Sequence, residues 1–152
     1  MRGRGPAFRY LAIHEAGHAV AAIRLRLSLR YTMLLARRQG EGSTVCALRK
    51  NGSPSRSERE AVLAYAGYEA ETRNFGRDDL AARLRADSDF NNALELARSV
   101  VTEDETTAWT NARRDEAREL VAAEWSAIEA TVDALLERRR LSGAEVRALM
   151  TP

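Results

Sequence analysis

Residues 13–20 read Ile-His-Glu-Ala-Gly-His-Ala-Val, and they contain both histidines of the 152-residue chain, His14 and His18. Residues four apart lie on the same face of an α-helix, so the two imidazoles can converge on one metal ion. Glu15 follows the first histidine directly, where it can exchange a proton with a metal-bound water. The stretch therefore predicts one half of a zinc site, with Glu15 as the general base.

The residues around this motif favour an amphipathic helix from about Ala7 to Ile23, after Pro6. Apolar side chains recur there at helical spacing, namely Phe8, Leu11, Ala12, Ala16, Ala19, Val20 and Ile23. Gly17 costs a helix about 0.5–1 kcal/mol relative to alanine. We therefore expect Gly17 to serve the close approach of another backbone or of a substrate.

The rest of the chain predicts a mainly α (α+β) fold of four to six helices with a small two- or three-stranded sheet. Alternating residues at 24–33 and 43–48 indicate two strands, which we expect to pair antiparallel. Further helical segments are expected at 57–74, 78–84, 89–101 and 110–139, and after a capping box that begins at Ser142. No boundary divides these elements, so residues 1–152 are expected to form a single domain.

Capping residues indicate where the predicted helices begin and end. Ser57 and Glu60 have capping-box spacing ahead of the 57–74 helix, and Gly76 is expected to end it. Ser88 or Asp87 is expected to cap the 89–101 helix, because both side chains can accept from the first free backbone amides.

The composition narrows the class of protein. Hydrophobic residues make up 45% and charged residues 30%, which is typical of a globular domain and not of a disordered chain. No apolar run approaches the ~18 residues of a membrane span, and the N-terminus lacks the apolar core of a signal peptide, so we expect no membrane segment and a cytoplasmic location. The lone Cys46 agrees with a reducing compartment. A net charge of +2, with arginines interleaved among acidic residues, indicates no nucleic-acid partner.

The chain has no third histidine to complete a zinc site, so a carboxylate is the expected third ligand. Glu69 or Glu71 would supply it from the 57–74 helix. An aspartate would come from the segment around 85–101, where Asp89 lies at a predicted helix start. The residues by themselves leave these alternatives open.

Several segments in order resemble the peptidase domain of FtsH-type ATP-dependent zinc proteases, and the likeness covers most of the chain. They are YLAIHEAGHAVAA (10–22), EGSTVCAL (41–48), AVLAYAGYEAETRNFG (61–76), DSDFNNALELARSVV (87–101) and LLERRRLSGAEVRALM (135–150). Their order and spacing make the resemblance more specific than the histidine motif alone, which other zinc proteases share.

Carried over position by position, the resemblance implies that His14, His18 and Asp89 bind Zn²⁺ and that Glu15 is the catalytic base. A carboxylate at a helix N-terminus is held ionised and oriented by the free amides and the helix dipole. Asp87 competes with Asp89 for the role of third ligand. Asp89 is favoured because the apolar Phe90 follows it, as a leucine follows the family's aspartate.

Glu71 then becomes a packing or supporting residue beside the zinc ligands. It also remains the alternative third ligand, in which case the chain would be a zinc protease of a different ligand set. The zinc content of variants at Asp89 and Glu71 separates the two interpretations.

The function that the resemblance implies is zinc-dependent hydrolysis of peptide bonds in flexible polypeptides or short peptides. Thr44, Val45 and Cys46 match the family's substrate strand and are expected to bind a peptide by strand addition. The chain contains no Gly-x-x-x-x-Gly-Lys phosphate loop, so a separate ATPase or a homo-oligomer is the further partner to consider. The rival interpretation is a non-catalytic module that keeps the fold for binding zinc or a partner. The presence of Glu15 favours the enzyme.

Overall fold

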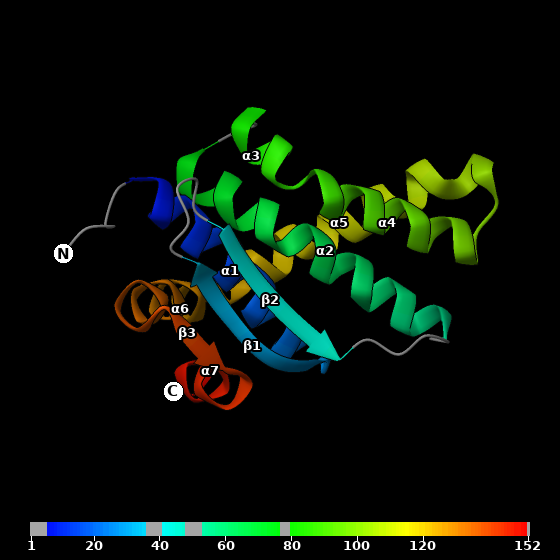
Figure 1. The fold of residues 1–152 in the computed structure, drawn as a ribbon. Coiled ribbons are helices and arrows are strands. Elements are labelled where there is room, and N and C mark those ends of the chain that lie inside the picture. Colours follow the sequence, from blue (N-terminus) through cyan, green and yellow to red (C-terminus); the bar gives the residue numbers. More distant parts are fainter. Residues whose placement is uncertain (1–5, 36–40, 48–52, 77–79, 152) are drawn as a thin grey trace.

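The computed structural model describes residues 6–35, 41–47, 53–76 and 80–151 (Figure 1). In chain order the elements are α1 (Pro6–Arg24), β1 (Ser28–Leu35), β2 (Glu41–Ala47), α2 (Pro54–Phe75), α3 (Leu80–Arg85), α4 (Asp87–Val100), the 3-10 turn η1 (Glu103–Glu105), α5 (Thr106–Ala123), α6 (Trp125–Arg138), β3 (Arg140–Ser142) and α7 (Gly143–Met150). The expected mainly α (α+β) class with a small sheet is confirmed. The described residues form seven α-helices, which is more than the four to six expected. Within these ranges, no helix combines the length and the hydropathy that crossing a membrane requires.

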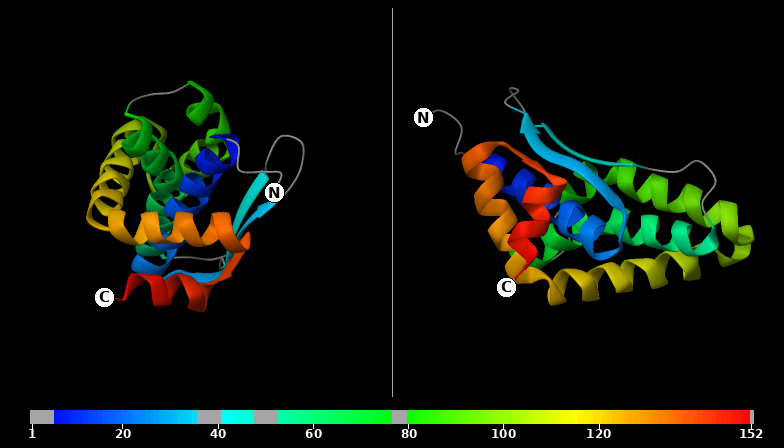
Figure 2. Two further views of the ribbon diagram at one scale, coloured as in Figure 1. Left: turned by 90° about the vertical axis from the view of Figure 1, so that its left-hand side faces the viewer. Right: turned by 90° about the horizontal axis from the view of Figure 1, so that it is seen from below.

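Helix α1 lies at the centre of the molecule and contacts α2, α6, α7 and both long strands (Figure 2). Every residue from Ala12 to Ala22 is buried. The expected amphipathic helix is therefore wrong for this stretch, because its polar residues are buried along with its apolar ones. Its many alanines, with Gly17, are small enough for neighbours to pack on all faces, so the histidine motif becomes part of the core.

Gly17 lies at a close approach between α1 and α2. A Cβ atom on Gly17 would lie 2.6 Å from the backbone oxygen of Ala66 and 2.8 Å from the Cβ of Ala70. Both distances are shorter than any ordinary packing contact. The expectation that Gly17 permits the approach of another backbone is confirmed, and that backbone is α2.

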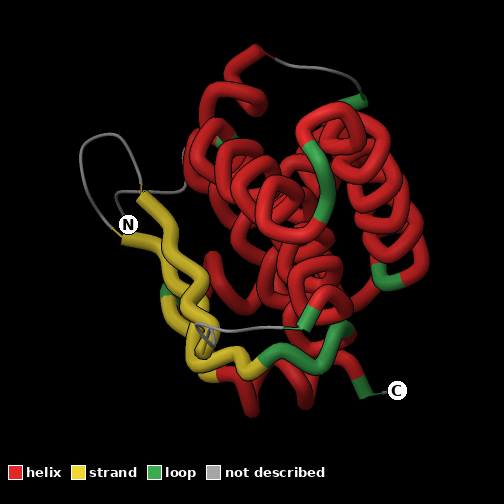
Figure 3. The backbone as a smooth tube through the Cα atoms, turned by 90° about the vertical axis from the view of Figure 1, so that its right-hand side faces the viewer, coloured by secondary structure: helices red, strands yellow, loops and turns green. Residues whose placement is uncertain are grey.

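The three strands form an antiparallel sheet in the order β2-β1-β3, which lies along one side of the helices (Figure 3). The predicted antiparallel pairing of the first two strands is confirmed, but β1 begins at Ser28 and not at Arg24. Residues 25–27 instead form the turn that leaves α1, with Arg26 at φ 57°. At the far end of the second predicted strand, Leu48 lies outside the described residues.

The start of α2 differs from the prediction, whereas its end agrees. Ser53 caps the helix by accepting from the amide of Arg56, and Pro54 occupies the first turn. The predicted capping box at Ser57 is therefore wrong, because that residue already lies inside the helix. Gly76 ends the helix in the left-handed region at φ 61°, as expected.

The helices of the C-terminal half are divided differently from the prediction. The segment 110–139 forms two helices, α5 and α6, which meet at Glu124. This division lets α5 pack against α2 while α6 packs against α1. Helix α4 begins at Asp87 with Ala86 at its cap position, so neither Asp87 nor Ser88 caps it. The helical turn expected at 78–84 corresponds to α3, and residues 78–79 lie outside the described part.

The last predicted helix is confirmed as α7. Ser142 accepts from the amide of Glu145, and the carboxylate of Glu145 accepts from the amide of Ser142. This reciprocal capping box matches the sequence pattern because it depends on four neighbouring residues only.

The effect of Gly17→Ala on the free energy of unfolding distinguishes tight packing from helix propensity, because the two predict opposite signs. Propensity alone predicts that Gly17→Ala stabilises the fold by about 0.5–1 kcal/mol. The contact with Ala66 instead predicts a net loss, because overpacking a core costs about 1–3 kcal/mol. Urea unfolding of the metal-free protein measures this, with Asn111→Ala on the exposed face of α5 as the control that should not destabilise. A Gly17→Ala variant more stable than the parent would contradict the packing account.

Candidate metal centre

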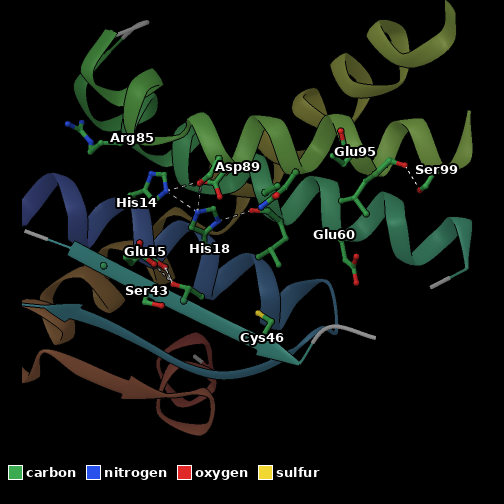
Figure 4. Close-up of a pocket in the computed structure, with 17 residues that line it drawn as sticks. His14, Glu15, His18, Ser43, Cys46, Glu60, Arg85, Asp89, Glu95 and Ser99 are labelled. Carbon is green, nitrogen blue, oxygen red and sulfur yellow. Dashed lines mark hydrogen bonds and ion pairs between the residues drawn. The ribbon is translucent and has the colours of Figure 1, made fainter. Parts of the chain in front are cut away.

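Three side chains from two helices converge at one point (Figure 4). His14 and His18 extend from successive turns of α1, and their Nε2 atoms lie 3.0 Å apart. Asp89 reaches them from the first turn of α4, with its Oδ2 atom 3.1 Å from Nε2 of His14 and 3.2 Å from Nε2 of His18. The structure thus brings together the two histidines of the motif and the aspartate that the resemblance favours.

The size of this triangle can be compared with what a metal ion requires. Ligands of a tetrahedral zinc ion, with bonds of about 2.0–2.1 Å, lie about 3.3 Å from one another. The observed separations of 3.0–3.2 Å are close to that value. Within the described ranges, His14, His18 and Asp89 are the group whose ligand atoms all lie within 4.8 Å of one another. Two imidazole nitrogens and one carboxylate oxygen are also a donor set that zinc commonly takes.

The outer nitrogen of each imidazole is already hydrogen-bonded, which fixes the tautomer that each ring has when it is neutral. Nδ1 of His18 lies 2.8 Å from the backbone oxygen of Leu63, and a carbonyl can only accept, so this nitrogen carries a proton. Nδ1 of His14 donates to the carboxylate of Glu71 at 2.7 Å. In the neutral rings both Nε2 atoms would therefore offer a lone pair to a metal ion bound between them and Asp89, the arrangement that orients histidine ligands in metal sites.

The other candidate carboxylates occupy different places. Glu71 is fully buried and pairs with Arg85 as well as with the outer nitrogen of His14, so it does not join the group of three. Glu69 is also buried, but it faces α5 and pairs with Arg114 at 2.8 Å. Asp87 has a side chain that is 65% exposed and pairs with Arg83.

The charges of the centre stabilise one another against burial. Burial alone would lower the pKa of His14, but its hydrogen bonds with Asp89 and Glu71 outweigh burial and raise that pKa to about 10. Burial alone would raise the pKa of Asp89, yet the two histidines hold it well below its usual range. The hydrogen bonds from His14 and Arg85 likewise lower the pKa of Glu71 in spite of its burial. In the metal-free protein the centre thus holds a proton where a cation would otherwise bind.

Gly67 on α2 is a residue of the site that the sequence analysis did not single out. A Cβ atom there would lie 2.6 Å from Nε2 of His18 and 2.8 Å from Nε2 of His14. Any side chain at this position would occupy the space in which the two ring nitrogens converge. A signal was present, because a glycine in the middle of a strongly helical segment is costly unless something approaches it closely.

Glu15 lies beside the group of three and faces strand β2. Its carboxylate Oε2 accepts a hydrogen bond from the hydroxyl of Thr44 at 2.5 Å. The side chain is largely buried, and it packs against Gly42, where a Cβ atom would lie 2.5 Å from Cγ of Glu15. The predicted base thus occupies the space between α1 and the edge of the sheet.

A cleft of about 710 Å³ opens between β2 and α4, and the metal centre forms part of its wall (Figure 4). Thr44 and Cys46 line this cleft, and Val45 is not among its lining residues. In the described sheet β2 is an edge strand, so one of its sides is not paired with β1. The cleft therefore offers an extended chain both the unpaired edge of β2 and the three converging side-chain atoms.

Neither a scan against protein-family models nor a search of the curated proteins gives a match for this chain. The resemblance to the FtsH-type peptidase domain therefore stays a prediction from the quoted segments.

The first prediction for the site concerns which carboxylate completes it. Asp89→Ala should abolish stoichiometric zinc binding, since it removes one of three converging ligand atoms. Glu71→Gln should weaken binding by about 10–100-fold, the usual effect of altering the partner of a ligating histidine. Asp87→Ala is the control and should bind as the parent does. Metal content after dialysis and competition with a chromogenic chelator measure all three. Loss of metal in the Glu71 variant alone would reverse the assignment.

The affinity for zinc is expected to depend on pH. Because His14 binds a proton with a pKa of about 10 in the metal-free protein, zinc must displace that proton at neutral pH. Affinity should therefore rise by about tenfold for each unit of pH up to about 10, and fall as the pH is lowered. Calorimetry at pH 7 in buffers of different ionisation enthalpy should show about one proton released per zinc bound. Binding without proton release would contradict the charge state inferred for His14.

Proposed function

We propose that this chain is a zinc-dependent metallopeptidase that hydrolyses peptide bonds in flexible polypeptides. The observation that carries the proposal is the convergence of two Nε2 atoms and one carboxylate oxygen beside Glu15, on the wall of a cleft that an edge strand borders. His14, His18 and Asp89 would hold the zinc ion. Zinc bound there would lower the pKa of a coordinated water to about 7 and polarise the carbonyl of the peptide.

The chain's own residues supply the remaining parts of the reaction. Glu15 follows His14 directly and lines the same cleft, so its carboxylate can accept a proton from the attacking water. The same carboxyl group can then give this proton to the leaving amine, which leaves one new carboxylate and one new amine as products. Burial of Glu15 keeps bulk water from competing for the carboxylate.

The substrate is expected to bind as an added strand. The unpaired side of β2 offers backbone amides and carbonyls to an extended peptide, and this places the peptide between β2 and α4. An extended conformation is available to flexible segments and not to folded domains, so unfolded chains and short peptides are the proposed substrate class. Val45 and Cys46 would act mainly through their backbone, whereas Thr44 also contacts Glu15.

The third prediction tests the role of Glu15. Glu15→Gln keeps the size and polarity of the side chain but removes its ability to take a proton, so peptide hydrolysis should fall by at least about 10²–10⁴-fold. Zinc stoichiometry should stay at the parental value, because Glu15 is not among the converging ligands. Cleavage of an unfolded reporter protein and of a fluorogenic peptide pool, each with and without zinc, gives the readout.

Two results would count against the proposal. A Glu15→Gln variant that binds zinc and cleaves as fast as the parent would exclude the assigned mechanism. A parent protein that binds zinc and cleaves neither the reporter nor the peptides would favour the non-catalytic zinc-binding module instead.

A further inference from the structure

Thr44 stands where three parts of the fold meet. Its hydroxyl lies 2.5 Å from Oε2 of Glu15 on α1 and 2.9 Å from the hydroxyl of Thr32 on β1. The same hydroxyl lies 3.3 Å from the backbone oxygen of Glu15. Thr32 and Thr44 are also register partners in the β1–β2 ladder, so the pairing of the strands itself holds their side chains on one face.

The direction of these hydrogen bonds follows from the number of protons available. An ionised carboxylate only accepts, so Thr44 must donate its single proton to Glu15. Thr44 then has no proton left for Thr32, and the hydroxyl of Thr32 must be the donor in that pair. Thr32 is fully buried, so bulk water does not compete for its hydroxyl. Thr32 thus donates a hydrogen bond to Thr44, and Thr44 donates one to Glu15.

Gly42 limits the position of Glu15 from another direction. A Cβ atom on Gly42 would lie 2.5 Å from Cγ and 2.8 Å from Oε1 of Glu15. The carboxylate therefore rests against bare backbone of β2 while Thr44 holds its other oxygen. Two residues of one strand, two positions apart and on the same face, define where the carboxylate lies.

We propose that Thr44 is a positioning residue for the base of the reaction, and that β2 sets the place of Glu15 in addition to bordering the substrate cleft. This inference rests on the peptidase function proposed above. By holding Oε2, Thr44 limits the orientations in which the carboxylate can accept the proton of the attacking water. A misplacement of about 1 Å in a catalytic group can cost about 10²-fold in rate, so this hydrogen bond bears directly on kcat.

The kinetic test compares loss of the hydroxyl with its retention. Thr44→Val keeps the shape of the side chain and should lower kcat by about tenfold to a hundredfold, with KM within about twofold of the parent. Thr44→Ser retains the donor and should restore most of kcat. The matched control is Thr131→Val, which removes a fully buried hydroxyl that bonds to Ala127 within α6 and should leave kcat unchanged. Zinc content should be the same in all four proteins.

A second readout does not depend on activity. In threonine-methyl NMR spectra of the metal-free protein, Glu15→Gln should shift the methyl signals of Thr44 and Thr32, because it replaces the acceptor at the end of these two hydrogen bonds. The signal of Thr131 should not move. The Thr44→Val and Thr32→Val variants assign the signals by their absence.

The outcomes separate this inference from the proposed function. If the parent cleaves no peptide but Glu15→Gln shifts both methyl signals, the peptidase function fails while the contact of Thr44 with Glu15 stands. If Thr44→Ser is as slow as Thr44→Val, or if Thr44→Val loses zinc, the positioning role is overturned. Unmoved methyl signals in Glu15→Gln overturn it as well, even if Thr44→Val does not fold.

Discussion

The close contact between α1 and α2 is the constraint on which the rest of the site depends. Gly17 brings α1 against the backbone of α2, and Gly67 leaves the space in which the two imidazoles converge. Leu63, Gly67 and Glu71 are spaced four apart, so they share one face of α2. Leu63 contacts Nδ1 of His18, Gly67 lies against both Nε2 atoms, and Glu71 contacts Nδ1 of His14. Helix α1 thus carries the two histidines of the candidate site, and α2 sets the orientation of their rings.

Burial of the charged groups at the candidate site is tolerable because each of them has a hydrogen-bonding or charged partner. Glu71 has no exposure and would be costly alone, but His14 and Arg85 both bind it. Asp89 gains from its place in the first turn of α4, where the helix dipole favours a carboxylate. The next residue, Phe90, fixes that turn through edge-to-face contacts with Tyr65 and Tyr68 of α2, at ring distances of 5.0 and 5.2 Å. Asp89 is therefore held in place by the packing of Phe90 as well as by charge.

The small sheet matters to this largely helical protein because its edge strand faces the cleft. Strand β2 borders the space in which a peptide is proposed to bind, and its Gly42 and Thr44 contact Glu15. Substrate binding and placement of the base are then properties of one strand. Strand β1 supports both, because it supplies the ladder and the hydroxyl of Thr32 behind Thr44.

The sequence by itself determined what depends on near neighbours. Helical spacing placed His14 and His18 on one face, and the capping box at Ser142 was predicted because it involves only adjacent residues. Asp89 was favoured only through a resemblance, and it is the tertiary structure that places Asp89, and not Asp87 or Glu71, beside both Nε2 atoms, because the two histidines lie 71 and 75 residues from Asp89 in the chain. The break at Glu124, the burial of residues 12–22 of α1 and the contact of Thr44 with Glu15 likewise depend on tertiary packing. Helix geometry fixes separations within a few turns, whereas the distance between remote segments is set by how whole helices and strands pack.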